Sequence, residues 1–180
     1  MSREKEFIDY LVELASPKDS GKAGTGSRDP GKRAELAALR RGASGEEHDL
    51  ARVYPLVLPR APTDPRRQEA YITVACLFGI HPTKREDLGR AVSLAEALRR
   101  LSADSASVEQ RFVALLQSHR EELTAHLRHC IALAKSNDIA LRWDDILEAL
   151  QWWDQEPARG RTPRERWAQA FWGPYAQNQQ

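Results

Sequence analysis

Two groups of residues in this 180-residue sequence have types and spacings that could support chemistry. The first is the run Gly26-Ser27-Arg28-Asp29-Pro30-Gly31-Lys32, which has the P-loop spacing G-x-x-x-x-G-K. In a P-loop, a Ser or Thr after the lysine holds Mg²⁺ and backbone N–H groups bind phosphate. Here Arg33 follows the lysine, and Pro30 removes one of the N–H groups. We therefore interpret this run as a flexible linker rather than a nucleotide-binding loop.

The second group is His126, His129 and Cys130, which lie at positions i, i+3 and i+4 of a predicted helix. This spacing can present metal ligands, but a closed site needs a fourth one and the sequence holds no second Cys/His cluster. Cys130 also points toward an apolar stripe, where a free cysteine acts as a small hydrophobic residue. His119 falls on the apolar face of another predicted helix and is expected to be a core or boundary histidine. We expect no metal.

Catalytic carboxylates and nucleophiles are also not indicated. Asp144 and Asp145 are adjacent, so on a helix they point about 100° apart and cannot act as a pair. Asp144 is expected to cap a helix instead. The sequence has no Ser-His-Asp set and no nucleophile elbow. We expect neither catalytic residues nor a cofactor, and therefore not an enzyme.

The basic residues suggest a different chemistry, the binding of phosphate groups. Arginine outnumbers lysine by 21 to 6, and its planar guanidinium suits phosphate. A nucleic-acid backbone needs several cations on one surface rather than a large net charge. Helical spacing gives these candidates: Arg33, Arg40 and Arg41 on one helix, Arg128 and Lys135 on another, and Arg111 and Arg120 flanking the helix before it. The alternative is that they are ordinary solvated arginines, several of them paired with Glu109, Glu121 or Glu122.

The elements that must position these residues are helices. The sequence has 25 Ala and 20 Leu but only 13 Val and Ile together, which favours helix. Apolar spacing and capping residues predict helices at 3–15, 33–41, about 46–53, 66–78, 93–101, from Ser107, 121–135, 144–153, and from the capping box Thr162-Pro163-Arg164-Glu165. Two prolines, Pro55 and Pro59, predict an extended connector at 54–59.

We therefore predict an all-α protein of two small helical bundles packed together, with about eight to nine helices. The expected domains are 1–92, with a flexible Gly-rich loop at 16–32, and 93–180. The five tryptophans are expected to pack in the second bundle rather than to stack on bases. Two cysteines exclude a disulfide scaffold, and the lack of an apolar run of membrane-spanning length excludes a membrane protein. The net charge of +1 gives no general signal for a polyanion partner. We expect a reduced, cytoplasmic protein.

An ordered series of short segments resembles a known family. The segments are Ala38-Leu39-Arg40-Arg41-Gly42, Ala70-Tyr71 through Cys76-Leu77-Phe78, Ser93-Leu94, Glu109-Gln110-Arg111-Phe112 to Leu115-Leu116, Ser118-His119-Arg120, Leu127-Arg128-His129, Trp143-Asp144, Leu150, Trp152-Trp153-Asp154, Arg166-Trp167-Ala168 and Phe171-Trp172. Together, over roughly residues 33–172, they resemble the small subunit (CasB) of Cascade, the type I-E CRISPR effector complex. The Gly-rich segment at 16–32 departs from that pattern, so its basic residues inherit no role.

The resemblance implies a non-catalytic, all-α subunit that is present as a pair. It would contact CRISPR RNA, target DNA and the displaced strand, stabilise the R-loop in antiviral defence, and adjoin the large and backbone subunits of the complex. Arg40, Arg41, Arg111, Arg120 and Arg128 match family positions and would contact phosphates, whereas Arg33 and Lys135 are added from helical spacing alone. The alternative function is a helical protein–protein adaptor without direct nucleic-acid contact.

Overall fold

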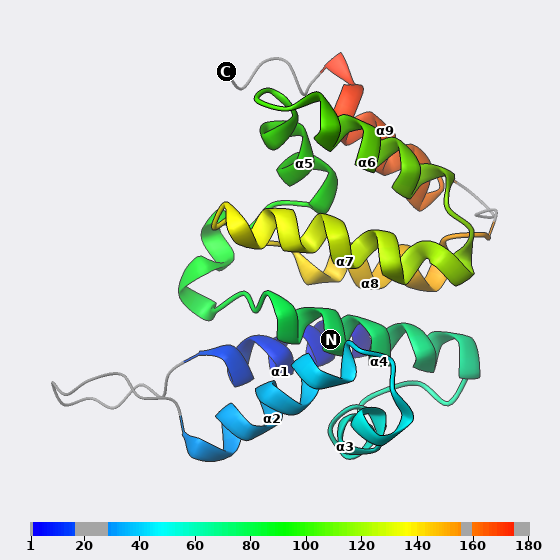
Figure 1. Cartoon of the computed structure of the whole chain (residues 1–180). Coiled ribbons are helices and arrows are strands. Elements are labelled where there is room, and N and C mark those ends of the chain that lie inside the picture. The colour runs from blue at the N-terminus through cyan, green and yellow to red at the C-terminus, as the bar shows by residue number, and fades with distance from the viewer. Residues whose placement is uncertain (1, 17–28, 156–159, 175–180) are drawn as a thin grey trace, which may run out of the picture. The chain divides into compact units, whose positions relative to one another are not determined.

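The computed structural model describes residues 2–16, 29–155 and 160–174, and most of these residues are helical (Figure 1). They contain nine α-helices, one 3₁₀-helix (η1) and no β-strand, which confirms the predicted all-α class. Contacts group the chain into an N-terminal unit, Met1–Arg90, and a C-terminal unit, Ala91–Gln180. None of the helices described here is both long and apolar enough to cross a bilayer.

The N-terminal unit is organised around α2. Its elements are α1 (Arg3–Ala15), α2 (Pro30–Gly42), α3 (Glu47–Val57), α4 (Pro65–Ile80) and η1 (Arg85–Arg90). Helix α2 packs against α1, α3 and α4, and α3 also packs against α4. The core they share is apolar and closed to solvent, and includes Phe7, Leu39, Val53, Tyr71 and Phe78.

The crossing of α2 and α4 depends on Gly79. We predicted that this helix ends at residue 78, but α4 includes Gly79 and continues to Ile80. A Cβ atom on Gly79 would lie 2.8 Å from the carbonyl carbon of Leu39 and would overlap the backbone nitrogen of Arg40. Gly79 therefore allows the backbones of α2 and α4 to approach each other closely, and it does not end the helix.

Two predicted boundaries in this unit were wrong. Helix α2 begins at Pro30, before the predicted residue 33, because Asp29 accepts a hydrogen bond from the Gly31 N–H at 2.9 Å and Pro30 fits the first turn. Residues 30–32 are thus helical and not part of the predicted loop, while residues 17–28 lie outside the described residues. Helix α3 includes Pro55, where we predicted an extended connector, because burial of Val53 and Val57 favours continuing the helix.

The C-terminal unit is built on contacts of α5 with three other helices. Its elements are α5 (Leu94–Ser102), α6 (Ala106–Gln117), α7 (Arg120–Ser136), α8 (Trp143–Trp152) and α9 (Pro163–Trp172). Helix α5 packs against α6, α7 and α9, α6 packs against α7, and α8 packs against α9. The predicted capping box at Thr162 is confirmed, since its hydroxyl accepts from the Glu165 N–H at 3.1 Å and the Glu165 carboxylate accepts from the Thr162 N–H at 2.8 Å.

Other local predictions in this unit need correction. Helix α6 starts at Ala106, with Ser105 rather than Ser107 before it, and it ends at Gln117. His119 is therefore exposed at the N-cap of α7 and is not a core residue. Asp144 lies within the first turn of α8 instead of capping it. Three tryptophans, Trp143, Trp153 and Trp167, are buried as predicted, whereas Trp152 and Trp172 are exposed.

Candidate nucleic-acid interface

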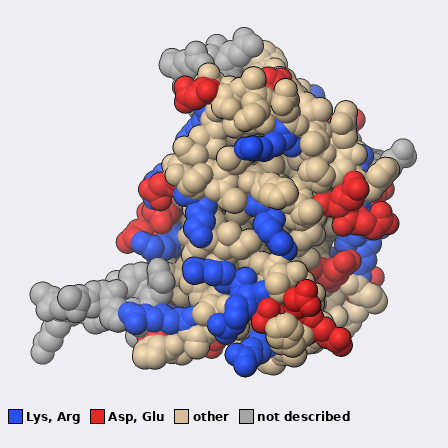
Figure 2. Space-filling model, viewed as in Figure 1, with Lys and Arg blue, Asp and Glu red and all other residues tan. Residues whose placement is uncertain are grey.

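Helix α2 carries the three candidate arginines of the N-terminal unit. Leu36 and Leu39 are buried, so the opposite side of the helix is left to polar residues. Arg33, Arg40 and Arg41 are all exposed. Arg40 and Arg41 lie in the last turn, where the helix dipole favours positive charge. Figure 2 shows basic side chains gathered over α2, with acidic ones over α3.

Arg40 is held in place by the same helix crossing that requires Gly79. Its Nε donates a hydrogen bond to the Gly79 carbonyl oxygen at 3.0 Å. This bond satisfies a carbonyl near the C-terminal end of α4 and fixes the guanidinium plane. The two terminal nitrogens of Arg40 have no carboxylate partner among the described residues, so this side of the guanidinium group remains available for a phosphate.

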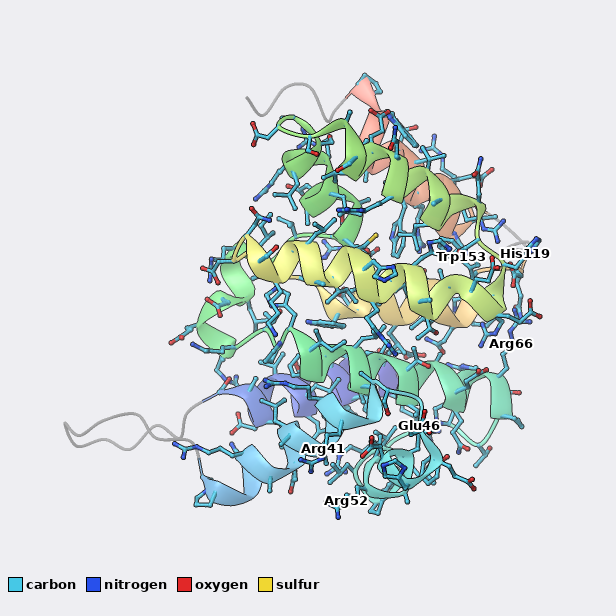
Figure 3. The ribbon with its side chains drawn as sticks, in the orientation of Figure 1. Arg41, Glu46, Arg52, Arg66, His119 and Trp153 are labelled. Carbon is cyan, nitrogen blue, oxygen red and sulfur yellow. The ribbon has the colours of Figure 1, made fainter. Side chains whose placement is uncertain are left out.

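Arg41 has a neighbouring cation that the sequence analysis missed. The Cβ position of Gly42 would lie 2.5 Å from a methyl group of Val53, which places α2 and α3 in close contact at these residues. Arg41 precedes Gly42 and Arg52 precedes Val53, and both arginines are exposed. In Figure 3 they extend from their two helices toward the same edge of the N-terminal unit. Arg41 and Arg52 form no ion pair within the described part of the chain.

In the C-terminal unit, two candidates are exposed on α6 and α7. Arg111 and Lys135 form no ion pair with any described carboxylate. Burial raises the pKa of the Cys130 thiol to about 12, and the nearby positive charge of Arg111 opposes that rise. Arg111 thus lies close to α7. Figure 2 shows basic side chains over α7 and between α6 and α7.

Arg120 and Arg128 are half-buried and have structural contacts. An Nη of Arg120 donates to the carbonyl oxygen of Leu150, near the C-terminal end of α8. The Nε of Arg128 lies inside the protein. The structure therefore ties Arg120 to the C-terminal end of α8. Arg111 and Lys135 are the more accessible of the four candidates in this unit.

The pairing alternative does not occur within the described residues. The carboxylate of Glu109 accepts a hydrogen bond from the Trp172 indole N–H at 2.9 Å. Glu121 and Glu122 are exposed and form no ion pair with a described cation. Elsewhere, several exposed arginines are paired, as Arg90 is with Asp87 at 2.9 Å and Arg100 with Glu96 at 2.6 Å. Among the candidates, Arg40, Arg41, Arg111 and Lys135 thus differ from the paired arginines of the same chain.

The His126, His129 and Cys130 group was weighed as a metal site. Cys130 is buried, and its raised pKa keeps the thiol protonated, whereas a metal binds the thiolate. The described residues contain no group of three His, Cys, Asp or Glu side chains placed to hold a metal ion.

Comparison with known proteins gives concordant matches. The model of the family described as CRISPR-associated protein Cse2 matches residues 35–172. A CRISPR-associated protein Cse2 from Thermus thermophilus is 33% identical over 177 residues, which cover 96% of this chain and 92% of the relative. A crystal structure of a Cse2-family protein from the same organism has a TM-score of 0.71 at 27% identity, covering 96% of this chain and 99% of the other.

A fourth match concerns the fold alone. A chain in a solved structure described as a CRISPR RNA-guided surveillance complex has a TM-score of 0.69 at 20% identity. The match covers 94% of this chain and 91% of that one. The arrangement of helices described above thus recurs in a chain of that complex.

Proposed function

The chain belongs to the CRISPR-associated Cse2 (CasB) family, and we propose that it is a non-catalytic, nucleic-acid-binding subunit of a CRISPR RNA-guided surveillance complex. In this role it contacts the backbones of CRISPR RNA, target DNA and the displaced strand, and it stabilises the R-loop in antiviral defence. It acts in the cytoplasm as a pair of copies, beside the large subunit and the backbone subunits.

One observation carries this proposal. Arg41, Arg52, Arg111 and Lys135 are exposed and form no ion pair within the described residues, in a chain that has 26 acidic residues available. Long cationic side chains kept apart from carboxylates can neutralise phosphates without first breaking a salt bridge. Arg40 adds a guanidinium group whose orientation is fixed by the hydrogen bond from its Nε to the Gly79 carbonyl oxygen.

The expected mechanism is electrostatic. Formation of an RNA–DNA heteroduplex is nearly balanced against the DNA duplex that it replaces, so protein contacts to the backbone can tip the equilibrium. Each cation that neutralises a phosphate releases counterions, which makes the contribution strongly dependent on salt. Base recognition is not required of this subunit, because the guide RNA reads the sequence by pairing.

The test is charge reversal in the assembled complex. The double variant Arg41→Glu, Arg52→Glu should lower the affinity for target DNA at least tenfold near 150 mM salt. It should also make the plot of log affinity against log salt shallower by about one to two units. Binding of labelled target DNA, measured across a salt series, gives both quantities.

The matched control is Arg90→Glu, Arg100→Glu, which makes the same change in net charge at two exposed arginines that are already paired. The control should keep DNA affinity within about twofold. Equal losses in the two double variants would show a general charge effect, and no loss in the test variant at low salt would remove the proposed interface.

A further inference from the structure

The 3₁₀-helix η1 differs from the other described elements because it contributes no residue to a core. None of the residues Arg85–Arg90 is buried. Its leucine, Leu88, is 47% exposed. The space beside Gly89 is open as well, since no atom lies within 4 Å of its Cβ position. Packing therefore does little to fix the conformation of η1.

The contacts within η1 are local in sequence. The Asp87 N–H donates a hydrogen bond to the Lys84 carbonyl oxygen at 3.0 Å, and Asp87 pairs with Arg90 at 2.9 Å. Lys84 pairs with Glu86 at 3.1 Å. Each of these contacts joins residues two or three positions apart, so none of them ties η1 to a distant element. Ion pairs this open to solvent contribute at most ~1 kcal/mol.

The start of η1 is anchored to the N-terminal unit. The backbone N–H of Arg85 donates to the Ser16 hydroxyl at 2.9 Å, just after the end of α1. An Nη of Arg85 also donates to the Glu13 carboxylate at 3.0 Å. These two contacts fix the chain at residue 85.

The segment after η1 is anchored to the C-terminal unit. The Val92 N–H donates to the Ala140 carbonyl oxygen at 3.0 Å, and the Val92 carbonyl oxygen accepts from the Arg142 N–H at 2.8 Å. This short bridge fixes the chain beside the connector between α7 and α8. Residues 86–91 are thus the part of the chain that lies between the two anchors.

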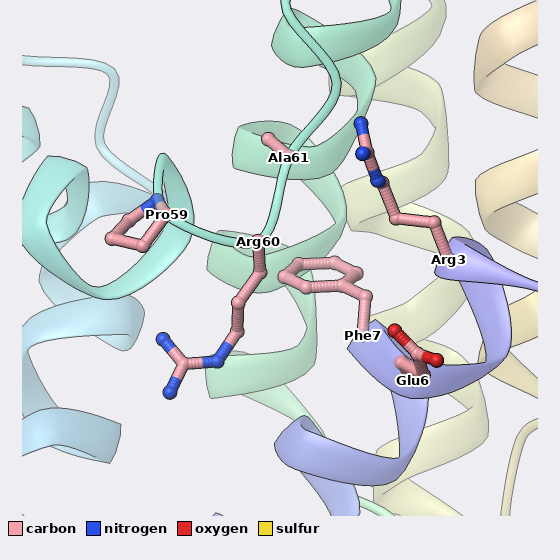
Figure 4. Close-up of a pocket in the computed structure, with 6 residues that line it drawn as sticks. All are labelled: Arg3, Glu6, Phe7, Pro59, Arg60 and Ala61. Atoms are coloured by element: carbon pink, nitrogen blue, oxygen red, sulfur yellow. The ribbon is translucent and has the colours of Figure 1, made fainter.

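Connectors inside one unit are held differently. In the connector between α3 and α4, the Cζ of Arg60 lies 3.7 Å from the Tyr10 ring centroid, and Arg60 lines a pocket together with the almost fully buried Phe7 (Figure 4). In the connector between α6 and α7, the Ser118 carbonyl oxygen accepts from the Trp153 indole N–H at 3.0 Å. Both connectors contact side chains that are distant in sequence, whereas residues 86–91 are bounded by such contacts only at their ends.

From these observations we infer that residues 86–91 form a hinge about which the N-terminal and C-terminal units change their relative orientation. A segment without buried residues has few contacts to lose when its conformation changes. Hinges are short segments that absorb a change of backbone angles while the elements on either side keep their own packing. Gly89 makes this change easier, because glycine adopts more backbone conformations than other residues.

The hinge has a consequence that rests on the proposed function. Arg41 and Arg52 belong to the N-terminal unit, whereas Arg111 and Lys135 belong to the C-terminal unit. Reorientation of the units changes the spacing between these two groups of cations. The groups can then follow a nucleic acid whose path changes, without loss of packing in either unit. The hinge itself does not depend on binding a nucleic acid.

The test is pulsed electron–electron double resonance on the full chain, with spin labels on introduced cysteines. Cys76 and Cys130 are buried, which keeps them from the labelling reagent. One pair of labels spans the two units, at exposed positions 47 and 132, and two reference pairs lie within one unit each, at 5 and 47 and at 110 and 132. Dilution with unlabelled protein removes distances between copies. We expect the distance distribution of the spanning pair to be at least about twice as wide as those of the reference pairs.

Two variants locate the motion. The double variant Ser16→Ala, Arg85→Ala releases the anchored start of η1, and it should widen the distribution of the spanning pair. Gly89→Ala should narrow that distribution, because alanine restricts the backbone. The matched control is Arg100→Ala, Ser102→Ala, which removes an ion pair and a hydroxyl hydrogen bond inside the C-terminal unit, and it should leave the width unchanged.

The inference is overturned by a spanning distribution as narrow as those of the reference pairs, by widths that neither variant changes, or by equal widening in the control. Circular-dichroism melting shows whether each variant is folded, and Ser16→Ala alone replaces a double variant that is not. The measurement uses no nucleic acid. A negative result therefore leaves the proposed function standing, and a failure of the DNA-binding test leaves the hinge standing.

Discussion

Replacing Gly79 by alanine tests the central packing of the N-terminal unit. The added methyl would meet the carbonyl carbon of Leu39 at 2.8 Å, the Cα of Arg40 at 2.9 Å and the backbone nitrogen of Arg40. All three are backbone atoms, so no rotamer change relieves the overlap and α2 must move away from α4. Overpacking of this kind costs ~3 kcal/mol, at the upper end of its usual range. Alanine recovers ~1 kcal/mol of helix propensity, which leaves a net loss of ~2 kcal/mol.

The measurement is thermal unfolding by calorimetry and by circular dichroism. A loss of this size lowers the Tm of a 90-residue unit by ~10 °C. Gly89→Ala is the control, because nothing lies within 4 Å of its Cβ position, and it should melt within about 2 °C of the unaltered protein. If Gly79→Ala also melts there, the close approach of α2 and α4 is refuted, and with it the anchoring of Arg40.

Two further predictions concern the C-terminal unit. Burial raises the pKa of Asp145 from 3.8 to about 6, so the folded state holds this proton more tightly than the unfolded state, and stability falls as the pH rises from about 4 through 6. Asp145→Asn removes the charge and keeps an oxygen acceptor for the Trp167 indole N–H. Urea denaturation should therefore show a free energy of unfolding that is higher by up to ~3 kcal/mol at pH 8 and only slightly higher below pH 4. Equal gains at both pH values would contradict the burial argument. Arg120→Met keeps the apolar stem but removes the hydrogen-bond donor to the Leu150 carbonyl oxygen, and it should lower the free energy of unfolding by ~1–2 kcal/mol in the same assay. An unchanged urea midpoint would show that this contact adds nothing to stability.

The sequence was most informative where a helix boundary depends on adjacent residues. Thr162 was recognised as a cap because its partner, Glu165, lies three residues away. The start of α2 was missed although its signal, Asp29-Pro30, is equally local, because the glycines around it were interpreted as a loop. The residues that start this helix could be recognised from the sequence, and the error was to give the neighbouring glycines more weight than Asp29 and Pro30.

Other features depend on contacts that no local pattern contains. Pro55 lies within a helix because Val53 and Val57 are buried by distant elements. Arg52 joins Arg41 only because Gly42 lets α3 approach α2. In the same way, the contact of Arg120 with Leu150 spans 30 positions of sequence. Spacing on one helix can propose which cations share a face, but the neighbouring helix decides which of them remain accessible.

The net charge of +1 is compatible with binding a polyanion because acids and bases are distributed unevenly. Many carboxylates are paired on other helices, as Glu13 is with both Lys32 and Arg85 at 2.6 and 3.0 Å. Each such pair removes one acid from competition for the unpaired cations on α2, α3, α6 and α7. Beyond the Debye length of ~10 Å at 0.1 M salt, the remaining acids have little influence on a bound phosphate. Under the proposed function, binding strength is set by the local surplus of cations, so a net charge near zero does not argue against a nucleic-acid contact.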